Sequence, residues 1–188
     1  MFAGNPPENP KTAEVEFSKK EVLGYTPMTH SRAIREMTSA GLARVHTEGR
    51  SRWLAMEGTP QAIWERAQSV LRTPVRSTVW VAEHAPLPNY PRRLTGISAL
   101  AYHTMIAEPQ WPVYAITEAG WKAATVDGVR ELSEPAEGAQ EWQVWNYTPE
   151  LVPGEPAVDA LSLSLSLQGS ADNRIQIALG ELQGTFPW

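Results

Sequence analysis

The chain changes its hydrophobic period at Gly41, and this change limits the folds that are open to its first half. Before Gly41, apolar residues recur every three or four positions, which is the spacing of one helix face. Thr29 is a suitable cap for the start of such a helix, and a glycine commonly ends one. The pattern therefore predicts a helix over residues 30–40 whose apolar stripe consists of Ala33, Ile34, Met37 and Ala40.

After Gly41, apolar and polar residues alternate in two short runs on either side of Gly49. Alternation is typical of half-buried strands, and a glycine between two strands supplies the positive φ that a tight turn requires. We expect a β-hairpin with strands at residues 42–47 and 50–56 and with Glu48 and Gly49 at the turn. Four side chains that are basic or can become protonated belong to this hairpin: Arg44, His46, Arg50 and Arg52.

The segment before the first helix predicts a second, shorter one. Prolines within the first ten residues block a long helix, so we expect residues 1–17 to be irregular. Ser18 and Glu21 have the spacing of a capping box, and Gly24 is suited to end a short helix. The two helices and the turn between them would form a helix-turn-helix, with the hairpin as a wing. Only residues 12–17 remain for the first helix of a three-helix core, so we expect an upstream part of the reading frame, a neighbouring chain or the second half to supply it.

Thr59 and Pro60 mark the start of another helix, because threonine caps helices and proline is tolerated at the first helical position. Apolar residues follow at helical spacing, which predicts a helix over residues 60–72. Pro74 ends this pattern, and we place a domain boundary there. The helix-turn-helix and wing therefore occupy residues 18–74, and the apolar positions of the last helix are Ile63, Trp64, Ala67, Val70 and Leu71.

Residues 75–188 alternate between strand and helix patterns, which predicts an α/β domain and an α+β chain as a whole. The expected strands are 75–82, 111–117 and 141–147, and the expected helices are 96–106, 118–125 and 172–186, with a proline-rich loop at 84–93. Leucine and serine alternate over residues 161–167, which taken alone indicates a strand. Asp159 is a suitable helix cap and favours a helix there instead, so the local pattern leaves both open.

Charge is distributed unevenly along the chain. The net charge is −5, and taken as one number it argues against a nucleic-acid partner, because neutralising phosphates needs clustered Lys and Arg. Residues 1–74 hold ten Lys and Arg against eight Asp and Glu, or +2, while residues 75–188 hold six against thirteen, or −7. Residues 18–52 hold seven Lys and Arg against three Glu. A local basic excess of this kind indicates that the first half meets a polyanion.

A helix of this kind fits the major groove of DNA, where arginine reads guanine edges, and a basic hairpin reaches the flanking phosphates. The candidate groove-facing residues are Thr26, Met28, Thr29, Ser31, Arg32 and Arg35. The candidate phosphate contacts are Lys19, Lys20, Arg44, Arg50 and Arg52. The alternative is that these side chains form an ordinary solvated helix face and hairpin. We favour DNA binding because weak signals occur together in a specific order.

Residues 24–37, with Ala40, Gly41 and the hairpin after them, resemble the winged helix of prokaryotic transcriptional regulators of the broad MarR-like kind. The rest of the chain, including residues 74–80, 112–116 and 158–167, resembles winged-helix regulators related to AbiEi-type antitoxins. This resemblance implies binding to operator DNA, action as a homodimer, an α/β C-terminal domain and a cognate toxin as partner. It also implies that residues 159–167 are helical.

We expect the protein to be a DNA-binding regulator, and the residues suggest no enzyme. The four histidines lack metal-ligand spacing, no phosphate-binding glycine loop or nucleophile elbow is present, and there is no cysteine, so we expect no metal, no cofactor and no catalytic residue. The segment 1–20 lacks a signal-peptide pattern and no run is long and apolar enough to span a membrane, so we expect a cytoplasmic protein with no membrane partner.

Two alternative functions remain open. One is a protein-interaction module, toxin-neutralising or partner-binding, that does not bind DNA. The other is a ligand-sensing regulator in which Trp142 and Trp145 line a ligand or partner surface. For these two tryptophans, packing in the core is the first interpretation.

Overall fold

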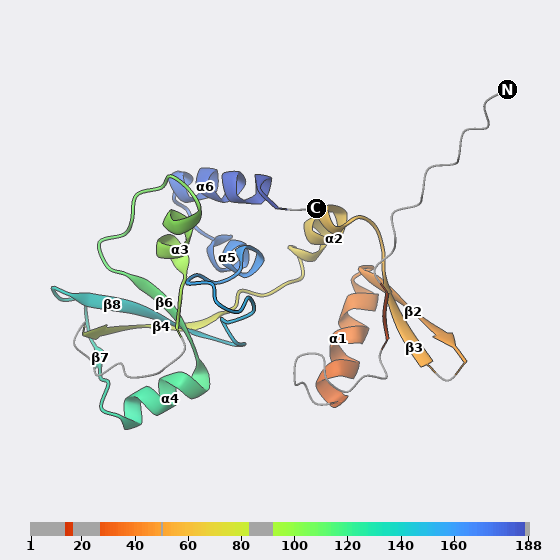
Figure 1. Ribbon diagram of the computed structural model, residues 1–188, viewed down its shortest axis with the longest axis horizontal. Coiled ribbons are helices and arrows are strands. Elements are labelled where there is room, and N and C mark those ends of the chain that lie inside the picture. Colours follow the sequence, from red (N-terminus) through yellow and green to blue (C-terminus); the bar gives the residue numbers. More distant parts are fainter. Residues whose placement is uncertain (1–13, 17–26, 50, 83–91, 187–188) are drawn as a thin grey trace. The chain divides into compact units, whose positions relative to one another are not determined.

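The computed structural model describes residues 14–16, 27–49, 51–82 and 92–186 (Figure 1). The backbone divides into two compact units, residues 1–71 and residues 72–187. Pro74 belongs to the second unit, because it is buried and its carbonyl oxygen accepts hydrogen bonds from the backbone and side-chain nitrogens of Asn146, at 2.9 and 3.3 Å. The division therefore falls slightly before the boundary that we placed at Pro74. The expected helix after Ser18 lies outside the described residues.

The first unit is built on an antiparallel sheet with the strand order β1-β3-β2. Its elements are β1 (Glu14–Glu16), α1 (Pro27–Ser39), β2 (Ala43–Glu48), β3 (Ser51–Met56) and α2 (Pro60–Ala67). The strand β1 corrects the expectation that residues 1–17 are all irregular. The edge of β3 that does not pair with β2 offers backbone groups for a third strand, and Glu14 and Glu16 pair there with Ala55 and Trp53.

The helix α1 begins earlier than expected. Pro27 occupies the first helical position, where its missing N–H costs nothing, so Thr29 lies within the first turn and is not the cap. The helix ends as expected: Gly41 adopts a φ of 66°, and the backbone N–H of Leu42 donates to the carbonyl of Met37 at 3.0 Å. This left-handed residue and the bond that closes over it are a common helix C-terminus.

The hairpin forms in the register from Ala43 opposite Met56 to Glu48 opposite Ser51. Glu48 is therefore a strand residue, and the turn lies one residue later than expected, with Gly49 at a φ of 61°. The capping of α2 by Thr59 is confirmed, since its hydroxyl oxygen accepts from the N–H of Ala62 at 3.3 Å.

The helix α2 is shorter than the expected 60–72 and ends at Ala67. Val70 and Leu71 are 55% and 45% exposed, so the last turn of the expected apolar stripe has no core to pack against. Trp64 and Ala67 of α2 belong to the same stripe, and both are buried. The first unit is thus a helix, a hairpin and a second helix that follow one another directly, with β1 completing the sheet.

The second unit is a five-stranded mixed sheet of order β5-β6-β8-β4-β7, in which β6 and β8 are parallel and the other neighbours antiparallel. An α/β arrangement was expected, and the two short edge strands β5 and β7 were not. The elements are β4 (Val75–Ala82), β5 (Arg93–Leu94), α3 (Gly96–His103), β6 (Val113–Thr117), α4 (Glu118–Val126), β7 (Glu131–Leu132), β8 (Ala139–Trp145), α5 (Ala160–Leu167) and α6 (Asn173–Gly184).

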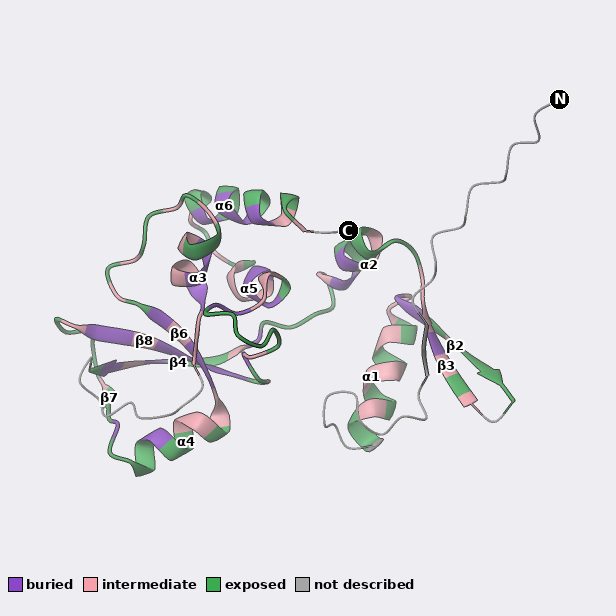
Figure 2. Cartoon of the chain, in the orientation of Figure 1, coloured by how far each residue is buried: buried purple, intermediate pink, exposed green. Residues whose placement is uncertain are grey.

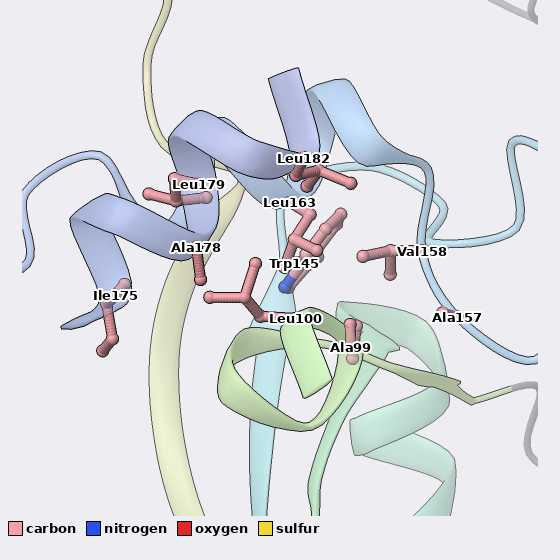
Figure 3. Close-up of a cluster of buried hydrophobic side chains, with 11 residues drawn as sticks. Ala99, Leu100, Trp145, Ala157, Val158, Leu163, Ile175, Ala178, Leu179 and Leu182 are labelled. Atoms are coloured by element: carbon pink, nitrogen blue, oxygen red, sulfur yellow. The ribbon is translucent and has the colours of Figure 1, made fainter. Parts of the chain in front are cut away.

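Both faces of this sheet are covered (Figures 1 and 2). One core lies between the sheet and the helices α3, α5 and α6, and it includes Leu100, Trp145 and Leu163 (Figure 3). The other lies on the α4 side and includes Val81 and Trp142. The central strand β8 contributes to both cores. Successive side chains of a strand point to opposite faces, so Trp145 lies in the first core and Trp142, three residues earlier, lies in the second.

The segment 159–167, for which the local pattern left strand and helix open, is the helix α5. Asp159 accepts from the backbone N–H of Ser162 at 2.9 Å, as a helix cap does. Serines tolerate burial in this helix because their hydroxyls find partners: Ser164 donates to the carbonyl of Ala160 at 2.9 Å, and Ser162 accepts from the Tyr147 hydroxyl at 2.9 Å.

Candidate functional site

The outward face of α1 carries two arginines, Arg32 and Arg35, and one acidic side chain, Glu36, all of them exposed. On a helix with 3.6 residues per turn, one stripe contains Met28, Ser31, Arg32, Arg35 and Ser39, and all five are exposed. The opposite stripe, with Ile34 and Met37 among its members, is half-buried. Packing of the apolar stripe therefore leaves Arg32 and Arg35 on the solvent side.

The register of the hairpin separates its basic side chains onto two faces. Residues directly opposite each other in an antiparallel pair share a face, so Arg52 lies with Thr47 on the face that also carries Val45 and the buried Leu54. Arg44 and His46 lie on the other face. Their closeness in sequence suggested one cluster, but the three that the structure describes, Arg44, His46 and Arg52, are divided between the two faces.

A hollow of about 420 Å³ joins α1 to one face of the hairpin. Arg35 contributes from the helix and Arg52 from β3, so two guanidinium groups border the same concavity. The remaining lining is small or apolar, and the full set is Ser31, Ile34, Arg35, Thr38, Ser39, Val45 and Arg52. A negatively charged ligand that contacts α1 at this hollow would meet arginines from both elements.

Arg44 forms an ion pair with the carboxylate of Glu57. Arg44 was expected to contact phosphate together with the other hairpin arginines. Its side chain is 80% exposed but points from the face opposite Arg52, and its charge is already balanced by Glu57. The structure therefore separates Arg44 from the arginines that border the hollow.

Arg66 fixes the two elements of the site in place. Its guanidinium donates to the backbone carbonyl of Gly41 at 2.9 Å and to the carbonyl of Glu57, and it also donates to Ala62 at 3.2 Å. One side chain on α2 thus joins the end of α1 to the end of β3. Hydrogen bonds from a charged donor are stronger than neutral ones, so Arg66 helps to hold α1 against the hairpin.

The remaining candidate residues from the sequence lie in α1 or outside the described residues. Thr29 is exposed in the first turn of α1. Thr38 and Ser39 line the hollow and were not among the candidates, although their spacing from Arg35 places them on the same side of a helix. Four candidates lie outside the described residues: Lys19, Lys20, Thr26 and Arg50.

Trp142 and Trp145 are each 1% exposed, so neither presents a surface to a ligand or partner in this structure. The indole N–H of Trp142 donates to Gln140 at 3.1 Å, and that of Trp145 donates to Gln143 at 3.4 Å. Buried indole N–H groups usually have such a partner, and Gln140 and Gln143 supply the acceptors inside this buried strand. The interpretation of these tryptophans as core residues is the one that their burial supports.

Within the described ranges, no group of three or more His, Asp and Glu is arranged to hold a metal ion. Among those residues, no helix is both long and apolar enough to cross a membrane.

No protein-family model matches this chain, and neither a curated protein nor a solved structure matches it.

Proposed function

We propose that the protein binds double-stranded DNA in a sequence-specific manner, with α1 in the major groove. The observation that carries this proposal is the exposed stripe on α1 that holds Arg32 and Arg35, with Glu36 beside it. The α-helix fits the major groove, and arginine forms bidentate hydrogen bonds with guanine there. Met28, Ser31 and Ser39 complete the stripe with side chains short or flexible enough to follow base edges.

Arg52 is assigned to the DNA backbone. It lies on a strand, on the α1 side of the hairpin, and borders the hollow opposite Arg35. A charge in that position suits a phosphate that flanks the groove, where contacts set the orientation of the protein without reading sequence. Lys19, Lys20 and Arg50 extend the same basic segment of the sequence and are assigned to phosphates on charge alone.

A helix followed by a hairpin, with a third strand that completes the sheet, supports a winged helix for the first unit. Its sequence resemblance to MarR-like regulators agrees with this assignment. We therefore infer that the protein is a transcriptional regulator and, by its weaker resemblance to AbiEi-type antitoxins, one that represses its own operon. The second unit, with its net charge of −7 over residues 75–188, would couple this activity to an effector or a toxin and not to DNA.

The test is selection of binding sites from a randomised duplex library by the full chain, followed by fluorescence anisotropy on the selected site. We expect a preferred sequence and an affinity that falls steeply as salt rises from 50 to 200 mM, because phosphate contacts release counterions. Enrichment of no sequence, together with co-purification of the product of a neighbouring gene, would favour the interaction module without DNA binding. A flat response to salt would exclude phosphate-driven binding.

A further inference from the structure

A hollow of about 490 Å³ lies in the second unit between α6 and residues 105–109, which follow α3. Its floor is continuous with the core of this unit. Ile175 and Ala178 of α6 line it and are 6% and 4% exposed, since both extend toward the core (Figure 3). Ile97 and Ile106 also line it and pack against the same core. The floor is therefore apolar, and the volume is in the range of about 300–1,000 Å³ that is typical of small-molecule sites.

Two large apolar side chains at this hollow are exposed to solvent. Met105, after α3, is 97% exposed, and Ile177, on α6, is 57% exposed. Exposed apolar surface that is gathered at a concavity and bordered by polar groups is typical of ligand-binding grooves. Methionine also adapts to ligands of different shape, because its side chain is unbranched and polarizable. The hollow therefore offers contacts to the apolar part of a ligand.

The charged side chains that line the hollow leave an excess of two carboxylates. Asp172 and Arg174 balance each other, because Nε and one terminal nitrogen of Arg174 donate to the two carboxylate oxygens at 3.2 and 2.7 Å. The other two are Glu108, after α3, and Glu181, on α6, and both are exposed. In the part of the chain that the structure describes, neither carboxylate has a hydrogen bond or an ion pair.

This arrangement favours a positive ligand over a neutral or a negative one. A cation is attracted by the carboxylates of Glu108 and Glu181, which belong to different sides of the hollow. An anion would meet two negative charges there, and the one guanidinium at the hollow already donates to Asp172. An apolar group attached to the cation would cover Met105 and Ile177 and so remove exposed apolar surface from water.

We propose that this hollow binds a small organic cation with an apolar body, such as an alkylammonium ion. The ammonium group lies near Glu108 and Glu181, and the apolar body lies over Met105 and Ile177. The site belongs to the second unit alone and does not rest on the proposed DNA binding. None of its residues belongs to the ligand surface that the sequence suggested at the two tryptophans of β8.

The test is titration of the full chain, labelled with ¹⁵N, with three probes that share one tail: n-octylamine, n-octanol and n-octanoate. The amine is protonated at pH 7, as a lysine side chain is. We expect saturable amide shifts in residues 105–109 and in α6 with octylamine, binding of octanol at least about fivefold weaker, and no saturation with octanoate. Glu108→Gln and Glu181→Gln should each weaken octylamine about two- to fivefold and leave octanol unchanged. Ile177→Ala should weaken both.

The matched control is Glu134→Gln, which removes the same charge at an exposed position of the second unit that does not line the hollow. It should leave the affinity for octylamine unchanged, and circular dichroism checks that every variant is folded. The proposal is overturned if octylamine does not saturate, if its shifts lie away from α6, or if octanol binds as tightly. It is also overturned if both glutamine variants at the hollow bind octylamine like the wild type. Each of these results would leave the proposed DNA binding standing.

Discussion

Replacing Gln140 with methionine tests the account of the buried tryptophans most closely. Gln140 is 8% exposed, and its side-chain oxygen accepts two hydrogen bonds of 3.1 Å, from the indole of Trp142 and from the guanidinium of Arg92. Methionine keeps the length of the side chain and removes the acceptor. The indole of Trp142, in a side chain that is 1% exposed, then has no partner.

The expected cost is about 1–3 kcal/mol of unfolding free energy, because a buried donor without an acceptor loses its hydration and gains nothing in return. Arg92 contributes less to this cost, since it is only half-buried and its guanidinium also stacks over the Tyr114 ring, 4.4 Å from the ring centre. The loss should therefore depend on Trp142. In a Trp142→Phe background the donor is absent, and Gln140→Met should cost less than about 1 kcal/mol.

Urea unfolding of the full chain, followed by far-ultraviolet circular dichroism, measures the four free energies of this cycle. The relevant unfolding transition is the one whose urea midpoint changes in the Trp142→Phe variant. For this transition we expect a coupling energy of about 1 kcal/mol or more between Gln140 and Trp142. Additivity of the two substitutions within about 0.5 kcal/mol would refute the idea that the glutamine is present to satisfy the indole.

Three further predictions concern the two units. Arg66→Ala should lower the stability of the first unit by about 1–2 kcal/mol in urea unfolding, since α2 loses its hydrogen bonds to the ends of α1 and β3, while Arg72→Ala should change it little. Asp159→Ala should cost about 1 kcal/mol and Asp159→Asn much less, because asparagine still caps α5. His103 is exposed, but partial desolvation lowers its pKa, so the folded state disfavours the protonated form, and stability should fall as pH drops below about 6.5 and level off below the lowered pKa. The variant His103→Gln should show a flatter profile, and an unchanged profile would contradict the role of this histidine.

The sequence predicted most elements whose signals are local. Thr59 and Asp159 cap the helices that follow them because a cap depends on a few neighbouring residues. The alternation around Gly49 predicted the hairpin for the same reason. By contrast, the two-residue strands β5 and β7 carry no periodicity, and they exist only because a neighbouring strand offers backbone partners. Short edge strands of this kind follow from tertiary pairing.

The candidate site was predicted in part. The spacing of Arg32 and Arg35 on a helix places them together without knowledge of the fold. The sequence could not tell Arg52 from Arg44, because the face of each hairpin residue depends on the register, which in turn depends on the residue at which the turn begins. The ion pair of Arg44 with Glu57 joins residues that are close only after β2 and β3 have paired.

The central claim is that α1 reads the base sequence of DNA, and the most direct test compares Arg32→Ala, Arg35→Ala and Arg44→Ala on the selected duplex and on a scrambled one. The account predicts that each of the first two weakens binding to the selected site by about 1–3 kcal/mol and has a much smaller effect on the scrambled site. Arg44→Ala, on the opposite face of the hairpin, should change both affinities little. Equal losses on the two duplexes for Arg32→Ala and Arg35→Ala, or a loss for Arg44→Ala as large as theirs, would contradict the claim.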